Sequence, residues 1–455
     1  MPQTQTIKNN TFRPIHYLGS KLRILDFIND TLDNLDPMQG TVCDLFSGSG
    51  TVSKFLSKNR RVVSVDIQEY SRVLCSALLN PSNLEMSAHD FIDSVASSDN
   101  YKKLRNVFSS LIRYEAEALD DARKGYINSL YEIIEYGSLL KIEQAELSEI
   151  NKYSPTFFSV LNETVAQIKK NGFDNNAKAM VARYFGGLYF SYEQAIQIDS
   201  ALEVAFQISE NGSSQRDILI AAILSATSDI VNTVGKQFAQ PLQVRDGKGK
   251  LKINLLPKIL NDRSMQFYER LLYWITQYVQ INPSASKHEI IRADYREALK
   301  KLQGGKVSII YADPPYTRYH YSRYYHVLET ICLRDTPEVS STFANKSGIS
   351  RGVYRKDRHQ SPFCIKTQAP EAFNELFNYA SKVNAPLVLS YSPFNNNQPA
   401  TPRMQSVENL VEQARTFYKY VDLLSPGYFT HSKLNETSKN FGIDTEAELL
   451  LVCKM

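Results

Sequence analysis

Residues 41–50 read TVCDLFSGSG, an apolar strand pattern that runs directly into a glycine-rich turn. The residues after the turn carry apolar side chains at helical spacing. A second β-branched run, RVVSVD (61–66), ends in Asp66, and a further helix is predicted over 69–80 before Pro81 stops it. Strand, glycine turn, helix, strand, acid and helix in this order predict the first half of a doubly wound parallel sheet.

The glycine-rich turn and the acid after the next strand together indicate a ligand site. Glycine allows positive φ and close approach of a ligand to the backbone, and the amides that start a helix attract a carboxylate or phosphate. A tight structural loop is the alternative for the turn alone. Asp66 favours the ligand, since an acid about 20 residues beyond such a turn accepts hydrogen bonds from ribose hydroxyls. Ser53 stands where a dinucleotide-binding motif has its third glycine, which argues against a pyrophosphate and favours S-adenosylmethionine.

A second informative stretch is IIYADPPY (309–316), an apolar run that ends in an acid, two prolines and an aromatic ring. Proline fixes φ and donates no amide hydrogen, so the strand stops there, at the edge where open α/β sheets bind ligands. The Asp313 carboxylate and a proline carbonyl can accept hydrogen bonds from a planar amine while the Tyr316 ring stacks on its face. A proline turn that merely closes a buried strand is the alternative, and Tyr311 is predicted to be a core residue.

The remaining sheet pattern lies in the last third of the chain. Strands are predicted over 289–294, through 309–316, over 386–391 and, as the closing edge strand, over 446–453. Between the two sheet regions, roughly 190 residues carry helical and acidic patterns, and a segment of that length in a compact protein needs a structure of its own. The predicted fold class is therefore α/β: a doubly wound, Rossmann-like sheet interrupted by a large, mainly helical inserted domain.

The composition is that of an ordinary globular protein, with 455 residues, 43% hydrophobic and 22% charged, and a net charge of +4. No run of about 18 apolar residues could span a membrane, and the N-terminus lacks the apolar core of a signal peptide. The five cysteines are scattered and form no Cys-x-x-Cys pair, so we expect reduced thiols in a cytoplasmic protein. The histidines have no carboxylate or cysteine partner at metal-ligand spacing, and no metal is expected.

These motifs and their order carry a resemblance to a known family. DLFSGSG (44–50) followed by DPPY (313–316) resembles the amino-group DNA methyltransferases, and HYLGSK (16–21) resembles the opening motif of the Dam-like, α-group adenine-specific members. In the predicted insertion, 189–199 and 232–235 resemble two further segments of that family. The cofactor motif, the insertion and the catalytic motif also follow one another in that family's order.

The resemblance implies S-adenosylmethionine as the cofactor and assigns residues to it. The opening motif is expected to fold back against the cofactor, Asp66 to bind its ribose and Asp294 to receive its adenine amine. The implied cofactor-binding residues are Tyr17, Gly19, Ser20, Lys21, Asp44, Phe46, Ser47, Gly48, Ser49, Gly50, Asp66, Ile67, Asp294, Tyr295 and Asp313. The implied catalytic residues are Asp313, Pro314, Pro315 and Tyr316.

The same resemblance implies a division of the chain into three segments. Residues 1–95 would form the first part of the catalytic domain, 96–284 an inserted target-recognition domain, and 285–455 the second part of the catalytic domain.

The residues after the Asp-Pro-Pro-Tyr turn are those expected of a nucleic-acid surface. TRYHYSRYYH (317–326) interleaves cations for phosphates with rings for bases, although a helix with its tyrosines packed inward is the alternative. Tyr321, Tyr325 and Leu328 have the spacing of such an inward stripe. Residues 341–366 read as a mobile basic loop, for which a solvated loop is the default and a phosphate clamp the functional prediction. The predicted nucleic-acid-binding residues are Arg318, Tyr319, Arg323, Lys346, Arg351, Arg355, Lys356 and Arg358.

The function implied by the resemblance is methylation of the exocyclic amino group of adenine in a specific double-stranded DNA sequence, with the base flipped out of the duplex. Aspartate rather than serine at the start of the motif favours adenine over cytosine. The implied setting is restriction–modification or an orphan methylase, with double-stranded DNA as partner, a cognate restriction endonuclease as a candidate partner, and no membrane. An RNA amine methyltransferase and a catalytically silent nucleic-acid-binding module of the same fold are the alternatives.

Overall fold

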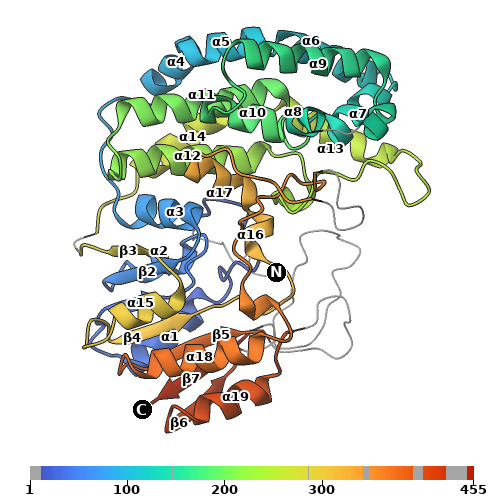
Figure 1. Ribbon diagram of the computed structural model, residues 1–455. Coiled ribbons are helices and arrows are strands. Elements are labelled where there is room, and N and C mark those ends of the chain that lie inside the picture. The colour runs from blue at the N-terminus through green and yellow to red at the C-terminus, as the bar shows by residue number, and fades with distance from the viewer. Residues whose placement is uncertain (1–11, 145–146, 285, 342–348, 393–402, 427–447) are drawn as a thin grey trace, which may run out of the picture.

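The described residues form a seven-stranded sheet, which lies in the lower half of the view in Figure 1. The computed structural model describes residues 12–144, 147–284, 286–341, 349–392, 403–426 and 448–455. The strands lie in the order β3-β2-β1-β4-β5-β7-β6. They are β1 (Val42–Asp44), β2 (Val62–Asp66), β3 (Glu289–Arg292), β4 (Ile309–Ala312), β5 (Leu387–Tyr391), β6 (Tyr420–Leu424) and β7 (Leu449–Lys454).

Strands β1 to β5 are parallel and join the two separated sheet regions of the chain. Cys43 of β1 lies opposite Val63 of β2 on one side and Ile310 of β4 on the other. The regions 41–66 and 289–316 therefore belong to one sheet, as predicted. Parallel strands end at the same edge, so the acids that end or follow β1, β2 and β4 are brought together there.

The position of strand β7 shows that one prediction was wrong. The strand runs antiparallel between β5 and β6, with Leu451 opposite Leu389 on one side and Leu423 on the other. The predicted closing edge strand over 446–453 is thus an interior strand, and the edge is β6, which was not predicted. The reason is visible in the residues: β7 is an uninterrupted apolar run that is buried nearly throughout, whereas β6 exposes most of its residues.

Helices cover both faces of the sheet, and this gives the α/β arrangement that the sequence predicts. Because successive strand residues point to opposite faces, Val42 packs on one side and Cys43 on the other. The first face is covered by α1 (Leu25–Leu35), α2 (Thr51–Leu56) and α3 (Glu69–Leu79). The second is covered by α15 (Tyr295–Lys301), α18 (Ala369–Ser381) and α19 (Val407–Arg415).

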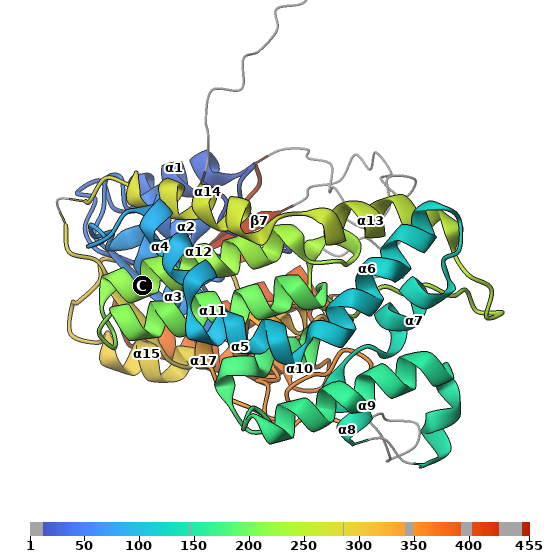
Figure 2. The ribbon, with the colours of Figure 1, turned by 90° about the horizontal axis from the view of Figure 1, so that it is seen from above.

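The region between α3 and β3 is mostly helical, as predicted, and its helices are stacked beyond α3 (Figures 1 and 2). The first of them crosses the predicted boundary at residues 95 and 96. The helices are α4 (Ala88–Ser97), α5 (Asp99–Val107), α6 (Ser109–Arg123), α7 (Asn128–Tyr136), α8 (Leu139–Glu143), α9 (Pro155–Lys170), α10 (Met180–Phe185), α11 (Tyr192–Ile208), α12 (Ser214–Ile230), α13 (Leu256–Ser264) and α14 (Phe267–Val279).

The helical region shares its apolar core with the sheet region. One cluster of buried side chains continues from α3, through Leu74 and Leu78, into Ile220 and Leu224 of α12 and on to the outer helices. The same cluster includes Leu328 of α17 (His326–Leu333), which follows α16 (Tyr321–Tyr324). None of the helices in the described part of the chain has the length and apolarity that crossing a bilayer would require.

Candidate active site

A cavity lies at the carboxyl edge of the parallel strands, where the topology predicts a ligand site. Its volume is about 1040 Å³, including the part that is open to solvent. The structure brings together there most of the residues predicted to bind the cofactor or to act in catalysis. Those that line it are Tyr17, Gly19, Ser20, Lys21, Asp44, Phe46, Ser47, Ser49, Asp66, Ile67, Asp294, Tyr295, Asp313 and Pro315.

The two glycines of the turn after β1 shape the cavity rather than line it. Gly48 has φ of 52°, and a Cβ built on it would lie 2.3 Å from the hydroxyl oxygen of Tyr17. Gly50 begins α2 with φ of 76°, and its Cβ would press on Leu78 and Cys75 of α3. Gly48 therefore leaves the space into which the N-terminal segment folds.

The N-terminal segment is held by tyrosines of α16 and the start of α17. Tyr17 stacks on Tyr325 with ring centroids 5.0 Å apart and planes inclined by 11°. The Leu18 amide donates a hydrogen bond of 2.7 Å to the Tyr325 hydroxyl, and the Tyr321 hydroxyl donates one of 3.1 Å to the Leu18 carbonyl. Tyr325 and Leu328 are buried, which confirms the inward stripe predicted from their spacing.

Asp66 connects the end of β2 to the glycine turn. Its Oδ2 accepts a hydrogen bond of 2.9 Å from the Gly48 amide, and its Oδ1 accepts one of 2.9 Å from the Gln68 amide. Burial raises the pKa of Asp66, and the two amides oppose that rise. Since a carboxylate oxygen accepts more than one hydrogen bond, Asp66 can hold this loop and still accept from a ligand in the cavity.

Asp313 follows β4 and pairs with a lysine from the N-terminal segment. The ammonium of Lys21 lies 2.9 Å from Asp313 Oδ2 and 3.3 Å from Glu448 Oε1 at the start of β7. Ser390 of β5 donates a hydrogen bond of 2.8 Å to the same Glu448 oxygen. Burial raises the pKa of Asp313 to about 6, Lys21 lowers it, and Glu448 raises it further. The predicted turn acid is therefore part of a buried charge cluster.

Tyr316 is packed beside Asp313 by a cation and a second ring. The Arg403 guanidinium lies 4.9 Å from the Tyr316 ring centroid, and the ring of Tyr391 is 5.2 Å away. Pro314 is buried beneath the turn. Tyr311 is fully buried in β4, as predicted for a core residue, although it also borders the cavity.

The far end of the cavity is aromatic and acidic. Asp294 begins α15 and accepts a hydrogen bond of 3.0 Å from the Arg296 amide. The ring of Phe46 lies 5.8 Å from that of Tyr295, and 5.6 Å from that of Phe363 at an angle of 87°. Three rings from three separate segments thus enclose this end of the cavity.

Several residues of the cavity were not predicted from the sequence. The Ser322 hydroxyl donates to the carbonyl of His359, and this contact brings the last part of the basic stretch over the cavity. A proline–phenylalanine pair inside an otherwise polar stretch is a weak signal for it. Among the residues that were missed are His320, Ser322, His359, Ser361, Pro362, Phe363 and, beside Lys21, Glu448.

Carboxyl groups dominate the charge of the cavity. Asp44 accepts a hydrogen bond of 2.6 Å from Ser53, and burial raises the pKa of Asp44 to about 7. Asp66, Asp294 and Asp313 line the same space. Because a nearby positive charge stabilises carboxylates, this lining favours a cationic ligand.

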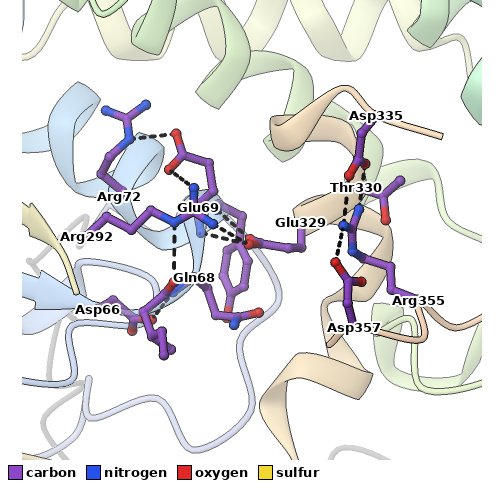
Figure 3. Close-up of polar contacts among 12 residues, drawn as sticks. Asp66, Gln68, Glu69, Arg72, Arg292, Glu329, Thr330, Asp335, Arg355 and Asp357 are labelled. Atoms are coloured by element: carbon purple, nitrogen blue, oxygen red, sulfur yellow. Dashed lines mark hydrogen bonds and ion pairs between the residues drawn. The ribbon is translucent and has the colours of Figure 1, made fainter. Parts of the chain in front are cut away.

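A network of charges ties α17 to the end of β3 and to the loop that carries Asp66 (Figure 3). Glu329 of α17 accepts hydrogen bonds of 3.0 Å from the amides of Glu69 and Tyr70, the first two residues of α3. Arg292 of β3 lies 3.2 Å from the Glu69 carboxylate and 3.6 Å from that of Glu329. It also donates to the Ile67 carbonyl at 3.4 Å. The segment after the Asp313 turn is thereby tied to the loop after β2 and to the end of β3.

Three of the predicted nucleic-acid residues have cationic groups with no carboxylate in ion-pair contact in the described structure. Arg318 is exposed near the Tyr319 ring. Arg323 and Arg358 both approach the ring of Tyr354, at 5.1 and 5.7 Å from its centroid. Burial lowers the pKa of Arg358, and the nearby Arg323 guanidinium lowers it further. This surface favours an anionic partner.

The other predicted nucleic-acid residues have different surroundings. Arg355 is buried and pairs with Asp335 at 2.6 Å and with Asp357 at 3.1 Å, so its setting favours a structural role over a phosphate contact. Arg351 donates to the Leu242 carbonyl at 2.6 Å, and the exposed Lys356 pairs with Glu338 at 2.8 Å. Lys346 lies outside the described residues.

The predicted mobile loop over 341–366 is replaced, in its described part, by packed structure. Lys356 and Ser340 donate backbone hydrogen bonds across it, to the carbonyls of Glu338 and Tyr354. Val353 is buried in the large apolar cluster. The physical reason is that apolar Val353 and Tyr354 interrupt the basic run and pack against the helical region.

The comparisons with known proteins agree with this geometry. Residues 17–181 match the sequence model of the D12 class of N6 adenine-specific DNA methyltransferases. The chain is 23% identical over 435 residues to Modification methylase LlaI of Lactococcus lactis subsp. lactis, covering 94% of this chain and 53% of the relative. It is 23% identical over 390 residues to Type II methyltransferase M.FokI of Planomicrobium okeanokoites, with 83% and 44% covered.

A third relative, Type II methyltransferase M.NlaIII of Neisseria lactamica, is 23% identical over 428 residues, with 91% of both chains covered. The chain thus spans about half the length of the first two relatives and nearly all of the third. No solved structure gives a significant match. The family match confirms the resemblance seen in the motifs: over residues 17–181, this chain is similar to the D12 class of N6 adenine-specific DNA methyltransferases.

Proposed function

We propose that this chain methylates the exocyclic amino group of adenine within a specific double-stranded DNA sequence, with S-adenosylmethionine as cofactor. The observation that carries the proposal is the meeting of Asp66, Asp294 and Asp313 in one cavity, each from the end of a different parallel strand. Asp66 and Asp294 can accept hydrogen bonds from the groups of an adenosine, and Asp313 can accept one from an amine. The family match supports adenine as the target.

The cavity fits the chemical groups of S-adenosylmethionine. Asp66 would accept hydrogen bonds from the ribose hydroxyls, and Asp294 one from the cofactor's adenine amine. The rings of Phe46 and Tyr295 would enclose the adenine, and the acidic lining complements the positive sulfonium. When bound, the cofactor supplies an activated methyl group.

Asp313 would orient the target amine. Lys21 contacts its Oδ2, so Oδ1 and the Pro314 carbonyl would accept hydrogen bonds from the two amino hydrogens. These bonds direct the nitrogen lone pair toward the methyl group and offset the positive charge that develops. Loss of one such partner typically costs on the order of 10²–10³ in rate. Tyr316 would stack on the base, a contact worth about 1–3 kcal/mol.

The target base must leave the duplex to reach this turn. Arg318, Arg323 and Arg358 would contact the phosphates on either side, which positions the DNA without reading its sequence. The helical region 96–284 would act as the target-recognition domain. The names of the relatives support a restriction–modification setting, in which a cognate endonuclease is the candidate partner.

The test is a methyl-transfer assay with labelled S-adenosylmethionine and unmethylated duplex DNA, followed by nucleoside mass spectrometry. We expect N6-methyladenine, and sequencing with modified-base detection should place it in one recurrent sequence. Asp313→Ala should abolish transfer while DNA affinity is kept. Label in single-stranded RNA but not in duplex DNA would favour an RNA methyltransferase. Absence of both transfer and calorimetric cofactor binding would identify a silent module.

A further inference from the structure

We propose that Glu448 is a positioning residue that holds Lys21 against Asp313 and sets how strongly the Asp313 carboxylate accepts hydrogen bonds. The inference rests on the proposed function, in which Asp313 orients the target amine. Glu448 lies just before β7, distant in sequence from the motifs that carry Lys21 and Asp313, and β7 runs antiparallel to both of its neighbours.

The geometry is that of a lysine shared between two acids. The Lys21 ammonium is 2.9 Å from Asp313 Oδ2 and 3.3 Å from Glu448 Oε1. Ser390 fixes Glu448 from the other side with its hydrogen bond of 2.8 Å. The Lys21 side chain is 6% exposed and that of Glu448 8% exposed, so these charges interact with little screening by water.

The charges do not balance, and the imbalance has a chemical consequence. One ammonium faces two carboxylates, so the cluster carries a net charge of −1 when all three groups are ionised. Because Lys21 divides its hydrogen bonds between the acids, Asp313 is only partly neutralised and keeps its strength as an acceptor. Without the charge of Glu448, Lys21 would pair with Asp313 alone and weaken that acceptor.

The same reasoning gives the direction of a pH effect. Burial raises the pKa of Asp313 to about 6, Lys21 lowers it and Glu448 raises it. Removing the Glu448 charge therefore lowers the pKa of Asp313, which then stays ionised to lower pH. The titratable groups that face Asp313 from the surrounding elements are Lys21, Asp44, Tyr311, Tyr316, Tyr321 and Glu448.

The experiment is the pH dependence of kcat/KM for duplex DNA in wild type, Glu448→Gln and Glu448→Asp. Glutamine has nearly the same shape and can still accept from Ser390, but it carries no charge. We expect Glu448→Gln to move the acid limb down by about one pH unit and to lower kcat roughly tenfold. Glu448→Asp keeps the charge on a shorter side chain, so its acid limb should stay at the wild-type pH while kcat falls several-fold.

Two comparisons separate this role from general destabilisation. Glu143→Gln removes a similarly buried carboxylate, 2.7 Å from Arg183 in the helical region, and should leave both acid limb and kcat unchanged. Asp44, whose pKa burial raises to about 7, titrates in a similar range, and because Asp313 ionises before it in both proteins, its contribution should move little in Glu448→Gln.

Several outcomes would overturn the proposal. One is folded Glu448→Gln protein with the acid limb and kcat of wild type. If Glu448→Gln does not fold, a wild-type kcat in Glu448→Asp overturns it instead. Wild-type protein that transfers no methyl group at any pH refutes the proposed function itself, and the role of Glu448 with it. An active wild type with unresponsive variants refutes the role of Glu448 alone.

Discussion

Gly48 allows the N-terminal segment to pack against the turn because it has no side chain. Its left-handed φ of 52° and the Tyr17 ring beside it make the position unsuitable for any other residue. Gly249 has a similar left-handed φ of 80°, but nothing lies within 4 Å of a Cβ built there. A comparison of substitutions at Gly48 and Gly249 therefore distinguishes the effect of left-handed backbone strain from the effect of a steric conflict with Tyr17.

Gly48→Ala should weaken cofactor binding, whereas Gly249→Ala should not. Both changes cost about 1–2 kcal/mol of stability from left-handed backbone strain. Gly48→Ala additionally displaces Tyr17 from the turn, and we expect its cofactor Kd to rise about tenfold or more. Calorimetry on the two variants measures this, and equal cofactor affinities would show that Tyr17 is not held by this contact.

Asp44 is an acid that the fold keeps partly protonated. Burial raises its pKa to about 7 from an ordinary value of 3.8, so its contribution to stability is full below that ordinary value and is lost as the pH rises through 7. Asp44→Asn can still accept from Ser53 and carries no charge. The variant should be more stable than wild type at pH 8 by up to about 4 kcal/mol, with almost no difference at pH 4. Denaturant unfolding at both pH values checks this, and a pH-independent difference would contradict it.

Site residues inside motifs could be predicted, and those outside motifs could not. Asp66, Asp294 and Asp313 each follow a recognisable strand, and parallel topology alone brings such acids together. His359 lines the same cavity and Glu448 contacts Lys21 beside it, both through contacts between segments that are distant in sequence. No local pattern encodes such a contact.

At the scale of elements, the start of α3 depends on a residue from another helix. Gln68 precedes α3 and gives it no side-chain cap, so the first two amides bind the Glu329 carboxylate instead. The loop before α3 carries Asp66. The position of α17 is therefore transmitted to the predicted ribose site.

Glu329→Gln should raise the KM for the cofactor several-fold while kcat stays within about twofold, because the change moves a binding loop and not the Asp313 turn. It should also cost about 2 kcal/mol of stability, since a charged cap is lost. Asp335→Asn is the matched control, because Asp335 lies just beyond α17 and pairs with Arg355 away from this loop (Figure 3). A higher cofactor KM in both variants would point to general loosening of α17.

The order of the strands could be predicted only in part. The first five strands have β-branched or apolar runs that end in acids or turns, and their parallel pairing follows from the predicted fold. Strand β6 has a weak pattern, with Tyr420, Leu423 and Leu424 exposed, so a sequence reading passes over it. Because β6 pairs with β7, β7 is an interior strand. The continuous apolar run of β7 was the sequence signal for this interior position.

At the scale of the whole molecule, the helical region and the sheet are joined by a shared core and by a buried ion pair. Arg72 of α3 binds both oxygens of Asp217 in the first turn of α12, at 2.8 and 2.9 Å. Asp217 is 2% exposed, so the pair is well shielded from water. The sequence predicted an inserted helical region, but not that its core would be continuous with that of α3.

Thermal unfolding should therefore be a single transition, and the single tryptophan of the chain can report it. Trp274 lies in α14, where its indole donates a hydrogen bond of 2.8 Å to Asp229, and it is not among the residues that line the cavity. Its fluorescence should change at the same temperature as the far-ultraviolet circular dichroism. S-adenosylhomocysteine should raise both midpoints equally. If the midpoint of the tryptophan transition does not rise with the ligand, the helical region unfolds separately from the sheet region.

The pairing of β2 with β3 has a consequence for synthesis on the ribosome. The Val62 amide binds the imidazole of His288, 226 residues further on. At a synthesis rate of roughly 5–20 residues per second, tens of seconds pass between the synthesis of β1 and β2 and that of β3 and β4, which flank them in the sheet. During that interval the nascent chain has two open strand edges, which invite pairing with other chains. Translation of the helical region is therefore the period in which this protein depends most on chaperones.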